Sequence, residues 1–184
     1  MMKQENKFEL HKLIQLGIFS TIVEDLDLNY WIEACYKMQK LEPQSVIKSN
    51  KGGWQSRNDL HQEKNFWPLI RTLQNGYSNI LDDPSQVITG LWLNISSYTN
   101  WNSPHTHVTL ADSYPYIKFS GVLYLKVPPN SGEINFKNPL NPNSYTEILP
   151  QEKMMIIFPS ILEHYVEPNL NQEDRISIAF NMYN

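Results

Sequence analysis

Three histidines in the second half of the chain have the spacing of a metal site. His105 and His107 stand two residues apart in the segment SPHTH, and His164 follows in the segment IIFPSILEHYV. On a strand, side chains two positions apart point to the same face, so the first two imidazoles can converge on one ion. Three imidazoles suit iron, nickel, copper or zinc rather than magnesium or calcium. Each histidine alone would be read as structural, and only the three together predict a metal centre.

A second polar pair, Arg175 and Ser177, follows in the segment DRISIAFN. Both stand on one face of the strand that this alternating segment predicts. A guanidinium can bind a carboxylate through two parallel hydrogen bonds, and a neighbouring hydroxyl adds one more. The competing interpretation makes Arg175 a surface ion-pair partner of Glu173 or Asp174. The presence of the three histidines is what favours the anion site.

The composition is that of a globular protein with an acidic balance. The 184 residues are 41% hydrophobic and 18% charged, and the formal net charge is −4. This balance argues against a broad nucleic-acid-binding surface, which needs clustered basic residues. The lone Cys35 excludes an internal disulfide framework and a cysteine-based zinc site, and we interpret it as a buried thiol. The apolar stretch LIQLGIF is too short for a signal peptide or a membrane span, which predicts a soluble, cytoplasmic protein without membrane contact.

The period of the hydrophobic residues changes along the chain. Residues 28–38 and 66–80 carry apolar side chains three and four positions apart. This spacing predicts two amphipathic helices, the first stopped by Pro43 and the second with Pro68 in its first turn. From Ser85 onward, short runs rich in β-branched and aromatic residues alternate with turns rich in proline and asparagine. Helices followed by several short strands predict a β-sandwich or jelly roll with a helical layer on one face.

Six segments, in order, resemble the iron(II)/2-oxoglutarate-dependent dioxygenases, and more narrowly the 2-oxoglutarate/iron(II) oxygenases seen in marine phages and bacteria. The segments are GGWQS, GLWLNIS, SPHTH, SGVLYLKVP, IIFPSILEHYVEPN and DRISIAFN, and together they cover most of residues 52–184. The resemblance implies a mainly β double-stranded β-helix, a cupin-like jelly roll, with N-terminal helices packed on one face. It also implies a single domain over residues 1–184, with a helical part over 1–84 and a jelly-roll core over 85–184.

The resemblance implies that Fe(II) binds at His105, His107 and His164. The usual ligands in that superfamily are two histidines and one carboxylate, whereas the position two after His105 is here a third histidine. Either His107 replaces the carboxylate, or an acid from elsewhere completes the set, with Asp112 and Glu163 as the candidates. We favour the three-histidine centre.

The resemblance also implies that 2-oxoglutarate is the cosubstrate and that Arg175 binds its distal carboxylate, with Ser177 beside it. Asn94, on the strand before the histidine pair, is placed to hydrogen-bond that carboxylate or a ligand histidine. Tyr124 is placed to reach the same anion, and a core aromatic with its hydroxyl at the edge is an equally weighted alternative. Gly121, on the same strand, marks a bulge or a close backbone approach.

The segment NKGGWQSRND, residues 50–59, is the candidate for a lid over the site. Its glycines would act as hinges, and Trp54, Gln55 and Arg57 would then contact the substrate. The alternative is an ordinary surface loop in which Trp54 packs down as an anchor.

The activity that the resemblance implies is oxygenation. The enzyme would use O2 and 2-oxoglutarate, release succinate and CO2, and hydroxylate an unidentified small-molecule or peptidyl substrate. Two rival functions stay open: a cupin-like metal enzyme that does not use 2-oxoglutarate, and a non-catalytic phage accessory or binding protein on the same scaffold. A homodimer is also left open, as is a phage origin with expression in the host cell.

Overall fold

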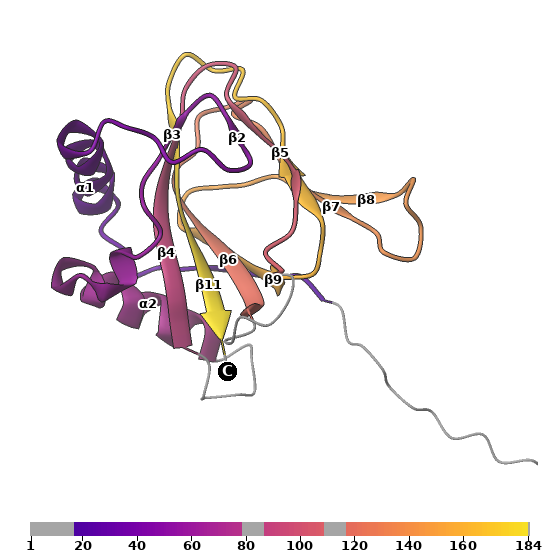
Figure 1. The fold of residues 1–184 in the computed structure, drawn as a ribbon, viewed down its shortest axis with the longest axis horizontal. Helices are drawn as coiled ribbons and strands as arrows, with labels where there is room; N and C mark the ends of the chain where they lie inside the picture. Colours follow the sequence, from indigo (N-terminus) through magenta and orange to yellow (C-terminus); the bar gives the residue numbers. More distant parts are fainter. Residues whose placement is uncertain (1–16, 79–86, 109–116, 184) are drawn as a thin grey trace, which may run out of the picture.

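Two antiparallel sheets face each other in the computed structural model, which describes residues 17–78, 87–108 and 117–183 (Figure 1). The larger sheet has the strand order β1 (Phe19–Ile22), β9 (Met154–Pro159), β6 (Ile117–Lys126), β11 (Arg175–Tyr183), β4 (Val87–Ser96) and β3 (Trp54–Gln55). The smaller sheet has the order β2 (Asn50–Lys51), β5 (Trp101–His105), β10 (His164–Val166), β7 (Ile134–Lys137) and β8 (Tyr145–Ile148). This arrangement confirms the predicted mainly β jelly roll.

Strand β11 has one apolar face and one polar face. Its alternation follows from the two-residue period of a strand, which sends successive side chains to opposite sides of the sheet. The side chains on the apolar face are fully buried, and they are Ile176, Ile178, Phe180 and Met182. The opposite face lines the interior of the roll with Arg175, Ser177, Ala179 and Asn181. The central strand therefore serves the core with one face and the interior cavity with the other.

Two helices cover the outer face of the larger sheet, as Figure 1 shows on the side of β4. Helix α1 spans Leu28–Leu41 and begins at Asp27, whose carboxylate accepts a hydrogen bond from the Tyr30 backbone N–H at 3.1 Å. Helix α2 spans Trp67–Ser78 and follows two short 3₁₀ turns, η1 (Leu60–Gln62) and η2 (Lys64–Phe66). Both predicted helices are therefore confirmed, and they pack on one face of the sheet.

The N-terminal part of the chain contributes strands as well as helices. Strand β1 pairs with β9, β2 pairs with β5, and β3 pairs with β4. These strands are only two to four residues long, which is too short for an alternating pattern to show in the sequence. Because strands from before and after residue 85 share both sheets, we propose that the chain forms one folding unit rather than a helical part and a separate roll.

The hydrophobic side chains form two clusters, one on each side of the larger sheet. The larger cluster joins the helices to the outer face of the sheet and includes Trp31, Leu73 and Phe180. The smaller cluster fills one end of the space between the sheets and includes Phe136 and Phe158. Since this second cluster does not reach β3 and β4, the space between the sheets stays open on their side.

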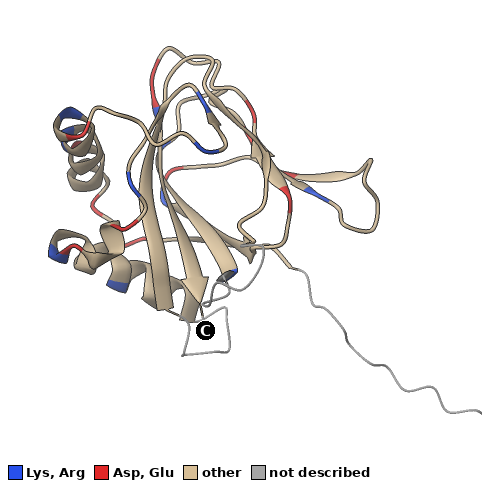
Figure 2. Cartoon of the chain, in the orientation of Figure 1, with Lys and Arg blue, Asp and Glu red and all other residues tan. Residues whose placement is uncertain are grey.

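Charged side chains of both signs are interspersed along the chain (Figure 2). In the ranges that the structure describes, no helix is both long and apolar enough to cross a membrane.

Gly121 allows a close approach between two strands of the larger sheet. It lies opposite Phe180 in the β6–β11 pairing, and a Cβ atom at this position would stand 2.3 Å from the phenyl ring. The close approach at Gly121 is therefore that of a side chain, the Phe180 ring, rather than the predicted approach of another backbone. Phe180 is completely buried, so its ring has no free space into which it can move.

We expect Gly121→Ala to lower the free energy of unfolding by about 1–3 kcal/mol, because the added methyl overpacks a closed core. Urea unfolding followed by circular dichroism measures the change. Gly90→Ala is the matched control, since Gly90 is also buried in the same sheet but its Cβ would meet only ordinary contacts at 3.7 Å. Equal stability losses in the two variants would contradict the packing argument.

Candidate active site

A cavity of about 880 Å³ lies between the two sheets and is lined by residues of both. Its lining includes every residue to which the sequence assigned a metal-binding or anion-binding role. These residues are His105, His107, His164, Arg175, Ser177, Asn94 and Tyr124. The fold thus brings together side chains that lie far apart in the sequence.

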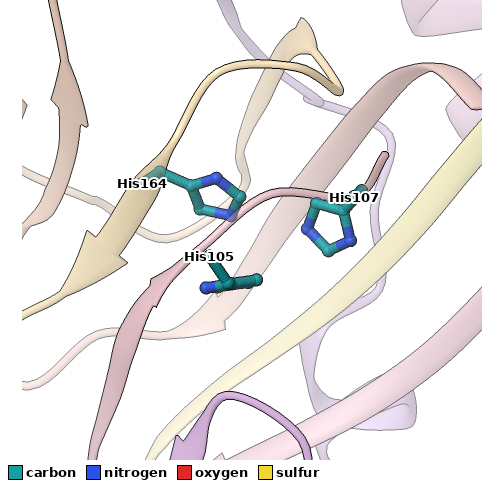
Figure 3. Close-up of side chains that lie close together, drawn as sticks. All are labelled: His105, His107 and His164. Atoms are coloured by element: carbon teal, nitrogen blue, oxygen red, sulfur yellow. The ribbon is translucent and has the colours of Figure 1, made fainter. Parts of the chain in front are cut away.

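The three histidines converge on one point at the wall of the cavity (Figure 3). One nitrogen from each ring lies within 4.8 Å of the corresponding atoms of the other two. The ring centroid of His105 lies 4.3 Å from that of His164 and 5.1 Å from that of His107. In the part of the chain that the structure describes, this is the one cluster of potential ligands whose donor atoms are so close.

The histidines come from two adjacent strands of the smaller sheet and the residues after one of them. His105 ends β5 and is directly opposite His164, which begins β10. The expectation that His105 and His107 share a strand holds only for the first, because β5 ends at His105. The backbone N–H of His107 instead donates to the carbonyl of Ser160 at 3.0 Å. The His107 ring still points to the other two, with its centroid 5.1 Å from each of theirs (Figure 3).

Hydrogen bonds to backbone carbonyls orient two of the imidazole rings. The Nδ1 atom of His105 lies 2.8 Å from the carbonyl oxygen of Ser103, and that of His164 lies 3.0 Å from the carbonyl oxygen of Leu162. A carbonyl can only accept, so Nδ1 carries the proton and Nε2 keeps its lone pair for a ligand. The Ser49 hydroxyl lies 3.3 Å from Nε2 of His105. Nε2 of His164 thus keeps its lone pair for an ion, whereas at His105 an ion would replace the hydrogen bond that Nε2 accepts from Ser49.

Burial keeps the imidazoles neutral. It lowers the pKa of His164 and of His107 to about 3, and the neighbouring histidines add to this effect. Burial likewise lowers the pKa of His105. The Phe158 and Phe136 rings pack against His164, with centroids 4.6 and 5.7 Å away. Since a metal ion binds the deprotonated ring, these neutral imidazoles fit a transition-metal ion.

Glu163, one of the two acids considered as a third ligand, does not take part in the observed cluster. The Glu163 carboxylate instead forms an ion pair with the Lys137 ammonium at 2.9 Å. Asp112 lies outside the described residues. The set that the structure brings together is therefore the three histidines.

Arg175 is buried, with 3% of its surface exposed, and its guanidinium is held by backbone carbonyls. Its Nη1 atom donates to the carbonyls of Ser131, Gly132 and Glu167. Burial lowers the pKa of Arg175, since the charged form has lost water. The fixed Nη1 leaves the rest of the guanidinium for a ligand in the cavity that Arg175 lines.

The alternative of a surface ion pair for Arg175 is wrong. Glu173 instead pairs with Lys126 at 2.8 Å. The Asp174 carboxylate accepts hydrogen bonds from the hydroxyls of Tyr36 and Ser97 at 2.9 and 2.7 Å. Both acids are therefore occupied outside the cavity.

The residues assigned to the anion stand in register across three strands. Ser177 lies opposite Asn94 in the β11–β4 pairing and opposite Tyr124 in the β11–β6 pairing. Arg175 is two positions along β11 on the same face. Tyr124 is buried, and burial raises the pKa of its phenol to about 12, so it stays a hydrogen-bond donor. The structure thus forms one polar row next to the guanidinium.

The segment 50–59 is anchored on both sides. Its first residues pair as β2 with β5, and Trp54 and Gln55 pair as β3 with β4. Trp54 is buried and its indole N–H donates to the Glu42 carbonyl at 2.8 Å. The structure therefore shows Trp54 as an anchor, and the segment forms part of the cavity wall.

Two supporting features escaped the sequence analysis. Ser49 contacts His105 through a pairing between distant segments, and nothing in its local sequence marks it. The loop that holds Arg175 had a detectable signal, because Gly132 follows Asn130 and Ser131 in a turn sequence and adopts a φ of +97°.

Comparison with known proteins agrees with this geometry. Residues 137–181 match the family described as "Putative 2OG-Fe(II) oxygenase". This segment contains His164, Arg175 and Ser177. No match was found among curated proteins.

Solved structures of similar fold include two prolyl hydroxylases and the 2-oxoglutarate-binding protein HygX. A prolyl-4-hydroxylase from Pseudomonas putida is 15% identical, with a TM-score of 0.69 over 92% of this chain and 93% of that one. The viral collagen prolyl hydroxylase of Paramecium bursaria Chlorella virus 1, in complex with 2OG, is 16% identical, with a TM-score of 0.65 and coverages of 90% and 95%. HygX from Streptomyces hygroscopicus, with nickel, 2-oxoglutarate and hygromycin B bound, is 10% identical, with a TM-score of 0.66 and coverages of 91% and 83%. At these identities the likeness establishes the fold.

We expect Gly132→Ala to lower the free energy of unfolding by at least about 2 kcal/mol, because the residue has positive φ and its Cβ would stand 2.1 Å from the Glu167 carbonyl oxygen. Thermal or urea unfolding measures the loss.

Ser131→Ala provides the control for this loop. The Ser131 hydroxyl is buried and has no hydrogen-bond partner among the described residues, and the residue holds Arg175 through its backbone carbonyl. Its removal should leave stability unchanged or raise it slightly. A Gly132→Ala variant as stable as Ser131→Ala would show that the loop tolerates a side chain.

Proposed function

We propose that the chain is a 2OG-Fe(II) oxygenase, and specifically a dioxygenase that hydroxylates an organic substrate; the family match over residues 137–181 and the jelly-roll fold support this proposal. The observation that carries the proposal is the joint placement of three convergent neutral imidazoles and a buried arginine in one cavity. Metal and anion sites that face the same cavity are what a metal-chelated keto acid requires.

The proposed iron ligands are His105, His107 and His164. Their donor set fits Fe(II), because imidazole nitrogens suit iron and the bonds from Nδ1 to backbone carbonyls leave Nε2 of each ring as the ligand atom, with the ion replacing the Ser49 hydroxyl at His105. When bound, iron and 2-oxoglutarate activate O2, so that one oxygen atom enters succinate as CO2 leaves and the other enters a C–H bond of the substrate.

The proposed role of Arg175 is to bind the distal carboxylate of 2-oxoglutarate. Its Nη1 atom is already fixed by three carbonyls, so the guanidinium offers its remaining donors in one orientation. Ser177, Asn94 and Tyr124 then add uncharged donors in the adjacent row. These residues orient the cosubstrate and replace the water that it loses.

The three-histidine set also affects charge in the cavity. Three neutral ligands leave both positive charges on the ion, whereas a carboxylate would remove one. No acidic side chain is found among the described residues that line the cavity. We propose that the dianionic cosubstrate supplies the neutralisation, which makes metal and 2-oxoglutarate binding strongly dependent on each other.

The substrate class is a small molecule or a peptide. The structural neighbours include HygX, whose structure holds hygromycin B, and a Trichoplax adhaerens prolyl hydroxylase in complex with a peptide fragment of hypoxia inducible factor. The cavity of about 880 Å³ is large enough for either kind of group beside the cosubstrate.

We expect Arg175→Ala to need about 10- to 100-fold more 2-oxoglutarate than the wild type, because it loses charge-assisted hydrogen bonds worth about 1.5–3 kcal/mol. The measurement is an anaerobic titration of metal-free protein with Fe(II) and then 2-oxoglutarate, following the visible metal-to-ligand charge-transfer band. Ser177→Ala should show a smaller shift in the same direction. Arg71→Ala, at an exposed position of α2, is the control for loss of a positive charge.

Each outcome of this titration decides between functions. A band with unchanged 2-oxoglutarate demand in Arg175→Ala would contradict the proposed role of the guanidinium. Iron binding without a band would favour a cupin-like enzyme that does not use 2-oxoglutarate. A wild-type protein that binds no iron would contradict the oxygenase proposal as a whole.

We expect His107→Ala to lower Fe(II) affinity by at least about 100-fold. Removing a residue that only orients a metal ligand lowers metal affinity about 10- to 100-fold, and removing the ligand itself should lower it more. His107→Asp should retain binding, because a carboxylate is the usual third ligand of this fold. Anaerobic equilibrium dialysis measures both. His61→Ala is the control, since His61 lies in η1 away from the cavity lining.

Unchanged Fe(II) affinity in His107→Ala would mean that an acid completes the ligand set. Asp112→Asn would then be the next variant to test.

A further inference from the structure

We propose that Asn169 is a positioning residue that fixes where the Arg175 guanidinium stands, and that it thereby sets the chain length of the 2-oxo dicarboxylate that the cavity accepts. This inference rests on the proposed function, because it takes Arg175 to bind the distal carboxylate of the cosubstrate. It goes further by naming a residue outside the cavity lining and the property of the cosubstrate that this residue controls.

The Asn169 side chain is completely buried, and its nitrogen and its oxygen both form hydrogen bonds. The Nδ2 atom donates to the carbonyls of Ser96 and Glu173, at 2.8 Å in each case. The Oδ1 atom accepts a hydrogen bond from the Asn171 backbone N–H at 2.9 Å. Because a displacement would leave buried polar groups unpaired, this amide is held in one position.

The two carbonyls that accept from Asn169 lie where Arg175 joins the larger sheet. Ser96 is the last residue of β4, and it stands opposite Arg175, the first residue of β11. Glu173 lies two residues before Arg175, in the loop that leads into β11. One amide group therefore fastens the end of β4 to the start of β11, at the pair of residues that contains Arg175.

The backbone of Asn169 binds the loop that follows β4. Its N–H donates to the Asn100 carbonyl at 3.0 Å, and its carbonyl accepts from the Thr99 N–H at 2.7 Å. Thr99 has a φ of +67°, a conformation that a β-branched residue keeps only when its surroundings hold it there. The loop between β4 and β5 is thus joined to the loop between β10 and β11, so neither shifts alone.

Asn169 also lies in the loop that supports the guanidinium. Two residues before it, the Glu167 carbonyl accepts from Arg175 Nη1. One residue after it, a backbone N–H donates to the Asn130 carbonyl at 2.9 Å. Asn130 begins the turn 130–132, which supplies the other two carbonyls that accept from the guanidinium. Both parts of this support are therefore connected to Asn169 through the backbone.

Groups that are fixed at both ends of the cavity select a ligand by its length. A 2-oxo dicarboxylate has to meet the histidine cluster with its keto acid end and the guanidinium with its distal carboxylate. Backbone carbonyls hold His105 and His164 at one end and Arg175 at the other. An arginine side chain has several rotatable bonds, so a guanidinium released from its support would follow a longer ligand. Discrimination between lengths then depends on how rigidly the guanidinium is held.

The test compares 2-oxoglutarate with 2-oxoadipate, which has one more methylene between the same two ends. Each is titrated anaerobically into Fe(II)-loaded protein, and the visible charge-transfer band reports binding of the keto acid. We expect the wild type to bind 2-oxoglutarate at least about tenfold more tightly, because the extra methylene does not fit between two fixed ends.

Two variants remove the bonds from Asn169 to the two carbonyls. Asn169→Asp keeps the size of the side chain and the acceptor for Asn171, but its carboxylate has no donor for either carbonyl. We expect about five- to twentyfold weaker binding of 2-oxoglutarate and an at least about threefold smaller preference over 2-oxoadipate, since the guanidinium loses its fixed position. Asn169→Ala, which adds no charge, should change both quantities in the same direction.

The Fe(II) affinity in the absence of a keto acid separates this role from damage to the metal site. It should stay within about twofold of the wild-type value in both variants, because His105 and His164 have backbone partners of their own. Anaerobic equilibrium dialysis measures it.

Leu73→Ala is the control for loss of stability alone. Leu73 is completely buried between α2 and the outer face of the larger sheet, and it is not among the described residues that line the cavity. Its truncation destabilises the core but should leave the affinities for both keto acids unchanged. Urea unfolding measures the stability of all three variants.

Unchanged affinity and preference in both Asn169 variants, or a wild type that binds the two acids equally, would overturn the inference while the oxygenase proposal stands. Equal changes in Leu73→Ala, or an equal loss of Fe(II) affinity, would overturn it too, since each indicates a general structural role. If Asn169→Asp does not fold, Asn169→Ala decides alone, and failure of both to fold would assign Asn169 to folding instead. A wild type without a charge-transfer band in 2-oxoglutarate would contradict the proposed function, and this inference with it.

Discussion

The register of strand β11 between β4 and β6 governs both the stability and the site of this protein. Pairing on both sides fixes the strand, so its odd-numbered side chains must all face the interior of the roll and its even-numbered ones the helices. A shift by one residue would move Ile176 into the cavity and Arg175 into the hydrophobic core. The burial of the apolar face therefore also positions the polar one.

The polar groups of the cavity are supported mainly by backbone atoms. Carbonyls orient His105 and His164 through Nδ1, and three further carbonyls hold the Arg175 guanidinium. Main-chain partners cannot change rotamer, so they hold a buried charge or an imidazole more rigidly than long side chains would. In the smaller hydrophobic cluster, Phe158 packs against His164 and keeps its ring from water. The same side-chain packing therefore stabilises the core and positions the histidine.

Much of this arrangement was predictable from local patterns. The long strands and both helices followed from their periods, and the spacing of the histidines indicated the metal site before any coordinates. The prediction that His105 and His107 share a strand was only half right, because β5 ends at His105 and the backbone N–H of His107 bonds to the Ser160 carbonyl. Strands β2 and β3 and the contact from Ser49 had no local signal, since two-residue pairings depend entirely on their partners.

The sequence by itself determined the types of chemistry available, the alternation that separates a polar from an apolar face, and the resemblance to an oxygenase family. Those properties are local, because they depend on residue type and on spacing within one element. The convergence of His164 with His105 and the burial of Arg175 among carbonyls came from the pairing of distant segments. Each depends on which strands become neighbours and in which register, and local spacing does not specify either.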